Sequence, residues 1–133
     1  GPINCFQSVE RREAFCTLMQ EMGLEYSFKR FRKRPEYPYF VGTYLETDPL
    51  DEDGLQECTF ILDGFARGPG SESALEAARE QIRNYFTYLG RTFTFDDGTV
   101  CVIAYGNAQP IPTDDAELDR IQINLTAMEW SVS

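Results

Sequence analysis

Apolar residues recur at helical spacing through residues 71–89, and strand-like runs lie on both sides of this segment. The apolar face of the expected helix consists of Leu75, Ala78, Ile82, Tyr85, Phe86 and Leu89. Ser73 and Glu76 have the spacing of a capping box, Ser71 is the alternative N-cap, and Gly90 suits the C-terminal cap. A helix with one apolar face has to cover another apolar surface, so this pattern predicts a helix packed on a sheet.

The segments after this helix predict three strands. Residues 91–95 and 99–105 flank Asp96-Asp97-Gly98, which is a hairpin signal. Residues 106–116 contain two prolines and predict a loop. Residues 118–132 alternate apolar and polar side chains and predict a long closing strand.

The segments before the helix predict another helix and three further strands. Residues 5–22 have near-helical apolar spacing, with Asn4 as a candidate N-cap and Gly23 as the C-terminal cap. The apolar face of this expected helix consists of Phe6, Val9, Phe15, Leu18, Met19 and Met22. Strands are expected over residues 26–33, 39–47 and 55–67, with a bulge at Gly42 and a polar turn at residues 48–54. Because Ile61 interrupts its polar face, strand 55–67 is expected to be central and covered on both sides.

The fold class that follows is α+β, in the order α-β-β-β-α-β-β-β, with two helices packed on one mostly antiparallel sheet. With 133 residues the chain is expected to form a single domain over residues 3–133. Gly1-Pro2, without an initiator Met, is typical of the remnant left when a protease removes an expression tag. Neither a transmembrane helix nor a signal peptide is expected.

The composition disfavours several kinds of chemistry. The chain has no histidine, which removes the commonest general base and metal ligand. Its net charge of −10 disfavours general binding to nucleic acids and to anionic membranes. The four cysteines, Cys5, Cys16, Cys58 and Cys101, lie far apart in apolar runs, so we expect buried, reduced thiols and no zinc site.

Three local motifs have features of a metal, phosphate or catalytic site, but none of them predicts such a site. The turn at residues 48–54 fails the EF-hand pattern, because Pro49 and Phe60 fall where acidic ligands are needed. Gly68-Pro69-Gly70-Ser71 precedes a helix but lacks the lysine and spacing of a P-loop. The acidic run of Asp114, Asp115, Glu117 and Asp119 predicts a solvated loop or a patch for a basic partner. No catalytic, metal or cofactor site is therefore expected, and the chain is not expected to be an enzyme.

One basic run departs from the acidic background. Lys29, Arg30, Arg32, Lys33 and Arg34 are five of the twelve basic residues, and the rest of the chain has a net charge of −15. If the run continues a strand, Arg30, Arg32 and Arg34 lie on one side and Lys29 and Lys33 on the other. It could protect a sheet edge from unwanted pairing, or it could dock on an acidic surface, including one on a neighbouring copy. Nucleic acid is a third possibility, because Phe28 and Phe31 lie among the basic residues.

The succession of segments resembles the tail-terminator and tail-completion proteins of long-tailed bacteriophages. After an N-terminal helix come a Pro-Tyr-led strand (PYFV), a strand ending in glycine (TFILDGFARG), a helix (LEAAREQIRNYF), a hairpin, a PIPTD loop and a hydrophobic closing strand (RIQINLTAMEW). The resemblance covers nearly the whole chain and is one of arrangement, without a diagnostic motif. It implies a virion protein that forms a ring, typically hexameric, caps the tail tube and joins it to the head connector, without a cofactor.

The leading hypothesis is a structural assembly protein that acts through contacts between copies. The alternatives are a monomeric module that offers an acidic surface to a basic partner, and a small enzyme with a carboxylate or cysteine centre. The candidate interface residues are Lys29, Arg30, Arg32, Lys33, Arg34, Asp114, Asp115 and Glu117.

Overall fold

The computed structural model describes residues 8–45, 55–95 and 98–130. In chain order the elements are α1 (Val9–Glu21), β1 (Glu25–Phe28), β2 (Tyr39–Leu45), β3 (Leu55–Arg67), α2 (Ser71–Phe86), β4 (Arg91–Thr94), β5 (Val100–Ile111) and β6 (Leu118–Trp130). This order confirms the predicted α-β-β-β-α-β-β-β arrangement.

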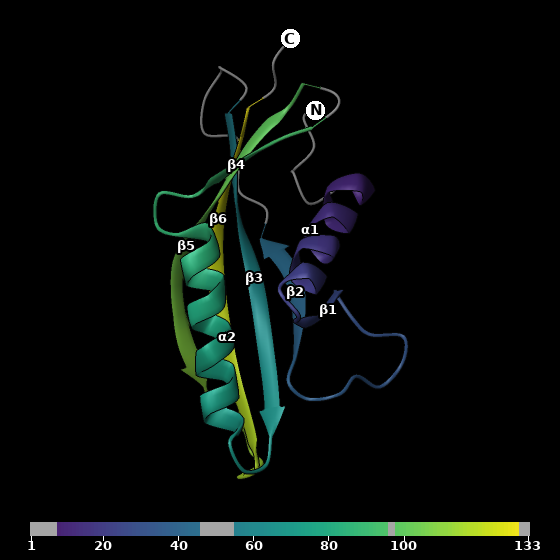
Figure 1. Ribbon diagram of the computed structural model, residues 1–133, viewed down its shortest axis with the longest axis vertical. Helices are drawn as coiled ribbons and strands as arrows, with labels where there is room; N and C mark the ends of the chain where they lie inside the picture. Colours follow the sequence, from purple (N-terminus) through teal and green to yellow (C-terminus); the bar gives the residue numbers. More distant parts are fainter. Residues whose placement is uncertain (1–7, 46–54, 96–97, 131–133) are drawn as a thin grey trace.

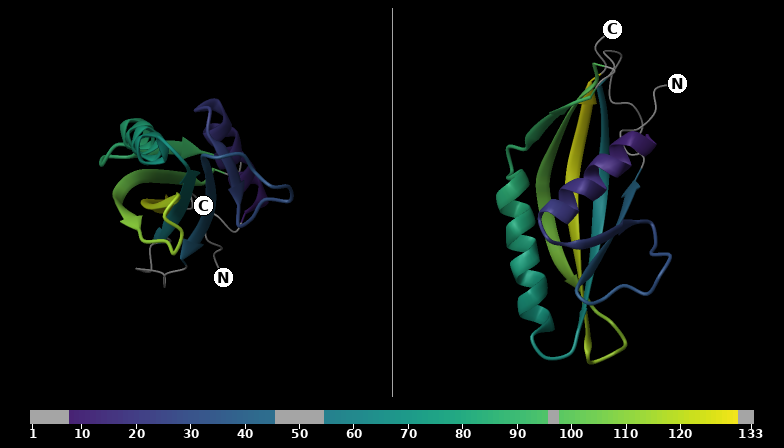
Figure 2. Two further views of the ribbon diagram at one scale, coloured as in Figure 1. Left: turned by 90° about the horizontal axis from the view of Figure 1, so that it is seen from below. Right: turned by 45° about the vertical axis from the view of Figure 1, so that its right-hand side comes forward.

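The strands form one six-stranded sheet in the order β1-β2-β3-β6-β5-β4. Every neighbouring pair is antiparallel except β1 with β2, which is parallel. Both helices lie on the same face of the strongly twisted sheet, α1 over the β1 side and α2 over the β5 side (Figures 1 and 2). The α+β prediction with a mostly antiparallel sheet is therefore confirmed.

The core lies between the two helices and the sheet face beneath them. Alternate residues of β3, β5 and β6 point into it, so that Phe60, Leu62 and Leu125 are fully buried. From α2 the core takes Leu75, Ala78, Ile82 and Phe86, as the helical pattern predicts. The core residues from α1 are Phe15 and Met19, together with the charged Arg11.

Two residues expected in the core lie on the surface. Val9 is 60 % exposed at the start of α1, because the buried stripe of that helix runs through Arg11, Phe15 and Met19. Leu89 is 93 % exposed, because α2 ends at Phe86, before the helical repeat reaches this leucine.

The side chains on the other face of β3 are half-buried by those of neighbouring strands, and no described helix covers them. The expectation that β3 is covered on both sides is therefore not met. Gly42 is not at a bulge either, because β2 and β3 pair without a register shift. A Cβ on Gly42 would lie 2.4 Å from the Tyr26 hydroxyl oxygen and 2.7 Å from Phe60 Cζ. The glycine is therefore required by the aromatic packing above it.

The basic run forms a loop instead of a strand. β1 ends at Phe28, and residues 29–38 leave the sheet before β2 begins at Tyr39. Lys29 has a φ of 66°, outside the β region, and Pro35 and Pro38 have no N–H to donate to a strand ladder. The predicted alternation of Arg30, Arg32 and Arg34 on one side of a strand is therefore wrong.

The expected loop at residues 106–116 is mostly strand. β5 continues to Ile111, and its register with β6 shifts between Tyr105 and Asn107, so Gly106 lies at a β-bulge. β4 pairs only with the first part of β5, so the rest of β5 has no described neighbour on that side. Proline is tolerated at such an edge, which explains how Pro110 fits within the strand.

The predicted caps are partly correct. Gly23 has a positive φ of 78° directly after Met22, the C-cap of α1, as expected. The prediction that Gly90 caps α2 is wrong, because the C-cap is Thr87. The capping box is wrong, since Gly70 is the N-cap of α2 and no side chain caps it. Ser71 instead donates its hydroxyl to Asp119 Oδ2 on β6.

Cys58 and Cys101 are buried, Cys16 is half-buried, and Cys5 and Asn4 lie outside the described residues. None of the described helices is both long enough and apolar enough to cross a membrane.

Candidate assembly surfaces

The basic loop, residues 29–38, is attached to the sheet at both of its ends. At its start, the Lys29 N–H donates to the Gly42 carbonyl over 2.8 Å, and the Ser27 hydroxyl donates to the Arg30 carbonyl over 2.6 Å. Further along, the rings of Phe31 and Tyr37 both pack on Tyr39, with centroid distances of 5.4 and 5.3 Å. These contacts hold the loop in a defined position beside the sheet.

The cations of this loop are left available for another molecule. Arg30, Arg32, Lys33 and Arg34 are all exposed. None of these four forms an ion pair with another described residue. Lys29 lies 5.6 Å from the centre of the Phe28 ring and is also exposed. A fixed loop that carries unpaired cations in an acidic protein is suited to bind an acidic surface.

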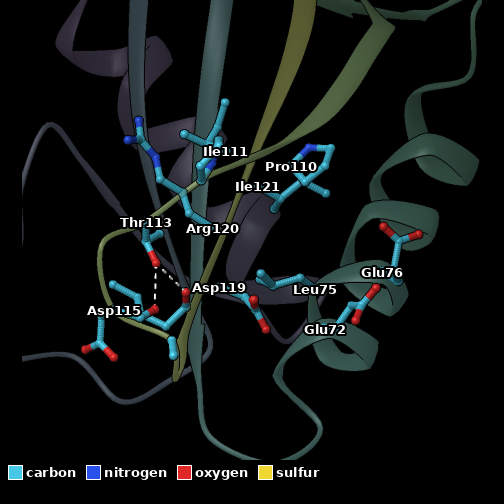
Figure 3. A pocket seen from close by; sticks show the side chains of 13 residues that line it. Glu72, Leu75, Glu76, Pro110, Ile111, Thr113, Asp115, Asp119, Arg120 and Ile121 are labelled. Carbon is cyan, nitrogen blue, oxygen red and sulfur yellow. Dashed lines mark hydrogen bonds between the residues drawn. The ribbon is translucent and has the colours of Figure 1, made fainter.

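A second surface lies where the first turn of α2 faces the β5–β6 connection (Figure 3). It is a groove of about 520 Å³, which we call the acidic groove. Its apolar lining includes Leu75, Ile111 and Ile121. Its acidic lining residues are Glu72, Glu76, Asp115 and Asp119. A groove with carboxylates around an apolar floor fits the aliphatic stem and charged head of an arginine or lysine.

Three of these carboxylates are held by contacts within the chain: Glu76 pairs with Arg79 on α2 over 2.8 Å, and the other two are Asp115 and Asp119. Asp115 accepts a hydrogen bond from the Glu117 backbone N–H and forms an ion pair with Arg67 over 2.8 Å. Both contacts favour the charged carboxylate, so the pKa of Asp115 lies below its ordinary value. Asp119 extends from β6 toward α2 and accepts the Ser71 hydroxyl (Figure 3). The acidic character of the groove therefore persists at neutral pH.

The predicted interface residues fall into two separate groups. Lys29, Arg30, Arg32, Lys33 and Arg34 stay together on the basic loop. Asp114, Asp115 and Glu117 stay together in the connection between β5 and β6, where Asp114 and Glu117 are exposed. Glu72 and Glu76 were not predicted, because only the packing of α2 beside β5 and β6 brings them to this connection.

The cations of the basic loop and helix α2 lie on opposite flanks of the molecule, whereas Asp115 lies nearer the end of the loop, because Arg67 contacts both Asp115 and the ring of Tyr37. Seen from below, the basic loop projects beyond β1 on one side, and α2 lies at the other side of the sheet (Figure 2). Within one chain the tip of the loop is therefore directed away from α2. A copy placed beside the molecule can bring its loop to the part of the groove that α2 lines.

The described residues contain no group of three or more cysteine, aspartate or glutamate side chains placed to hold a metal ion. The groove offers carboxylates and an apolar floor, and the loop offers guanidinium and ammonium groups. Together they are suited to recognition between charged surfaces. In comparisons with known proteins, the sequence matches no protein-family model and no curated protein.

Proposed function

We propose that the protein is a structural subunit that assembles into a ring through head-to-tail contacts between copies. The observation that carries this proposal is the combination of two surfaces: a fixed loop with exposed cations that form no ion pair with another described residue, and an acidic groove that α2 lines on the other flank. When a surface on one copy meets a different surface on the next, the contact is heterologous, and it closes into a ring where the rotation permits.

The role we propose for the ring is that of a phage tail terminator, which caps the tail tube and meets the head connector. The proposal is supported by the succession of sequence segments that resembles this family and by the α+β fold class. On this proposal the protein has no cofactor, acts in the virion, and forms a ring that is hexameric by resemblance. Its partners are other copies, the tail-tube protein and the head connector.

A second candidate is a monomeric module that offers the acidic groove and the exposed carboxylates of the β5–β6 connection to a basic protein. The exposed carboxylates of Glu72, Asp114 and Glu117 support it, because no other described residue neutralises them. It leaves the exposed basic loop without a role, whereas head-to-tail assembly uses both surfaces.

Size-exclusion chromatography with light scattering tests the assembly proposal. At low ionic strength we expect a species larger than a monomer whose population grows with protein concentration. In about 1 M salt the Debye length falls to roughly 3 Å, so the assembly should weaken. A strict monomer at every protein concentration and ionic strength would contradict the proposal. If that monomer binds a basic protein instead, the second candidate is supported.

A further inference from the structure

The exposed Leu89 belongs to a small apolar projection that is held in a fixed conformation. Tyr88 is 68 % exposed, and together with Leu89 it forms what we call the Tyr88–Leu89 knob. An exposed leucine by itself requires no explanation.

Several contacts fix the knob where α2 ends. The Thr87 N–H donates to the Arg83 carbonyl, and the Thr87 carbonyl accepts the Tyr105 N–H, both over 2.8 Å. The Tyr88 ring packs edge-on against Tyr105 with a centroid distance of 5.4 Å. Gly90, with a φ of 88°, lies so close to β5 that a Cβ would be 2.8 Å from Val102. Since these contacts already order the loop, a partner that binds Leu89 loses little loop entropy.

An apolar recess lies on the opposite flank, between α1 and β1. Its volume is about 260 Å³, which is larger than one leucine side chain. Its lining residues are Val9, Arg12, Glu13, Cys16, Ser27 and Phe28. The Arg12 guanidinium lies 5.0 Å from the centre of the Phe28 ring, so charged groups surround a mostly apolar interior. The exposed Val9 is therefore part of the lining of this recess.

The two flanks carry their features in the same order along the long axis of the molecule. On the α2 flank, the knob lies at the end of the helix and the acidic groove at its beginning (Figure 1). On the α1 flank, α1, whose residues line the recess, lies above the basic loop in the same view. A neighbouring copy whose long axis is parallel can therefore place its knob against the recess and its acidic groove against the basic loop at the same time.

We propose that the Tyr88–Leu89 knob of one copy inserts into the apolar recess between α1 and β1 of the next copy. The inference rests on the proposed head-to-tail assembly and specifies the apolar part of that contact and its direction. A second copy is the partner that fills the recess, because the acidic groove accompanies the knob on the α2 flank and the basic loop accompanies the recess on the α1 flank. The same placement therefore brings opposite charges together. The long axes of the subunits then lie side by side around the ring.

Cross-linking from an introduced cysteine to Cys16 tests this contact. Leu89→Cys in a Cys5→Ser background is treated with a short bismaleimide at mildly alkaline pH. Burial and the nearby Glu13 carboxylate raise the pKa of the Cys16 thiol, so alkaline conditions increase its reactive thiolate. We expect a ladder of covalent oligomers on a denaturing gel. Adding Cys16→Ser should remove the ladder, and Ser73→Cys, exposed at the other end of α2, should give none.

Substitution at Leu89 provides a second measurement. Leu89→Glu should weaken association at least about tenfold, because burial of a leucine side chain contributes that much or more. Leu89→Met should change association by no more than about twofold, because methionine fills a similar apolar volume. Since Leu89 is 93 % exposed, both variants should fold, and circular dichroism checks that they do.

The outcomes separate the two proposals. If the protein assembles but gives no ladder that depends on Cys16, the knob contact is wrong and head-to-tail assembly stands. If Leu89→Glu assembles as well as the unsubstituted chain, the knob contact is also wrong. If the protein never associates, both proposals fail.

Discussion

Reversing the charge of Arg32, Lys33 and Arg34 to glutamate should abolish self-association at concentrations where the unsubstituted protein is fully assembled. All three side chains are exposed at the tip of the basic loop, and none has an ion-pair partner among the described residues. Like charges brought together at an interface cost several kcal/mol, so association should weaken at least about thirtyfold, or about 2 kcal/mol. Light scattering across a dilution series measures the change.

A matched pair of variants separates a local contact from general repulsion. Arg32→Gln, Lys33→Gln and Arg34→Gln together change the net charge from −10 to −13. Thr92→Glu, Thr94→Glu and Gln109→Glu make the same change at exposed positions outside the basic loop. Only the first triple variant should weaken assembly clearly. If both weaken it equally, net charge and not the loop controls association.

Replacing Arg11 by methionine should lower the free energy of unfolding by about 3–5 kcal/mol. Arg11 Nη1 lies 2.5 Å from Glu129 Oε1, and the two side chains are only 6 % and 8 % exposed. Arg11 also lies 4.8 Å from the centre of the Phe95 ring. The substitution removes the Arg11 guanidinium from beside the buried Glu129 carboxylate, and removing one partner of a buried pair is costly. Urea unfolding followed by circular dichroism measures the loss.

Two controls accompany this variant. Arg79→Met breaks the more exposed pair with Glu76 on α2 and should cost less than about 1 kcal/mol. The double variant Arg11→Met with Glu129→Leu should recover most of the loss, because both charges leave the core together. An Arg11→Met variant as stable as Arg79→Met would show that the buried pair does not matter for folding.

The regular elements could be predicted from the sequence because their patterns are long and their positions in the sheet reinforce them. The bounds of strand 55–67 were correct, since its alternating burial runs from Cys58 through Phe60 and Leu62 to Ala66. α2 was also predicted, although it ends three residues early. The periodicity of apolar residues does not reveal that Thr87 adopts a φ of 58°, and this conformation ends the helix before Leu89.

The errors occur where tertiary contacts override local pattern. Residues 29–34 have strand-like aromatics, but Lys29 leaves the β region, and Phe31 packs on Tyr39 from outside the sheet. In α1 an arginine occupies a core position because Glu129 on β6 compensates its charge. Residues 106–111 contain Pro110 yet remain in a strand, because an edge position does not require its N–H.

Only part of each candidate surface could be predicted from the sequence. The basic and acidic runs are local clusters, so both could be named in advance. The remainder of the acidic groove depends on the sheet order β3-β6-β5, which places the start of α2 beside the β5–β6 connection. The apolar knob and recess could not be predicted, because Leu89 and Val9 fit helical core patterns. Leu89 is exposed because α2 ends at Phe86, and Val9 is exposed because the buried stripe of α1 runs along another face.

Mixing two charge-reversed variants tests head-to-tail assembly most directly. One variant carries Arg32→Glu, Lys33→Glu and Arg34→Glu, and the other carries Glu72→Lys, Asp114→Lys and Glu117→Lys. Alone, each brings like charges together and should be monomeric by light scattering. Mixed in equal amounts, they should return to the mass of the unsubstituted assembly, because native loops meet native acidic surfaces and reversed loops meet reversed acidic surfaces. A mixture that stays monomeric or stops at a dimer, or assembly by either variant alone, would contradict the account.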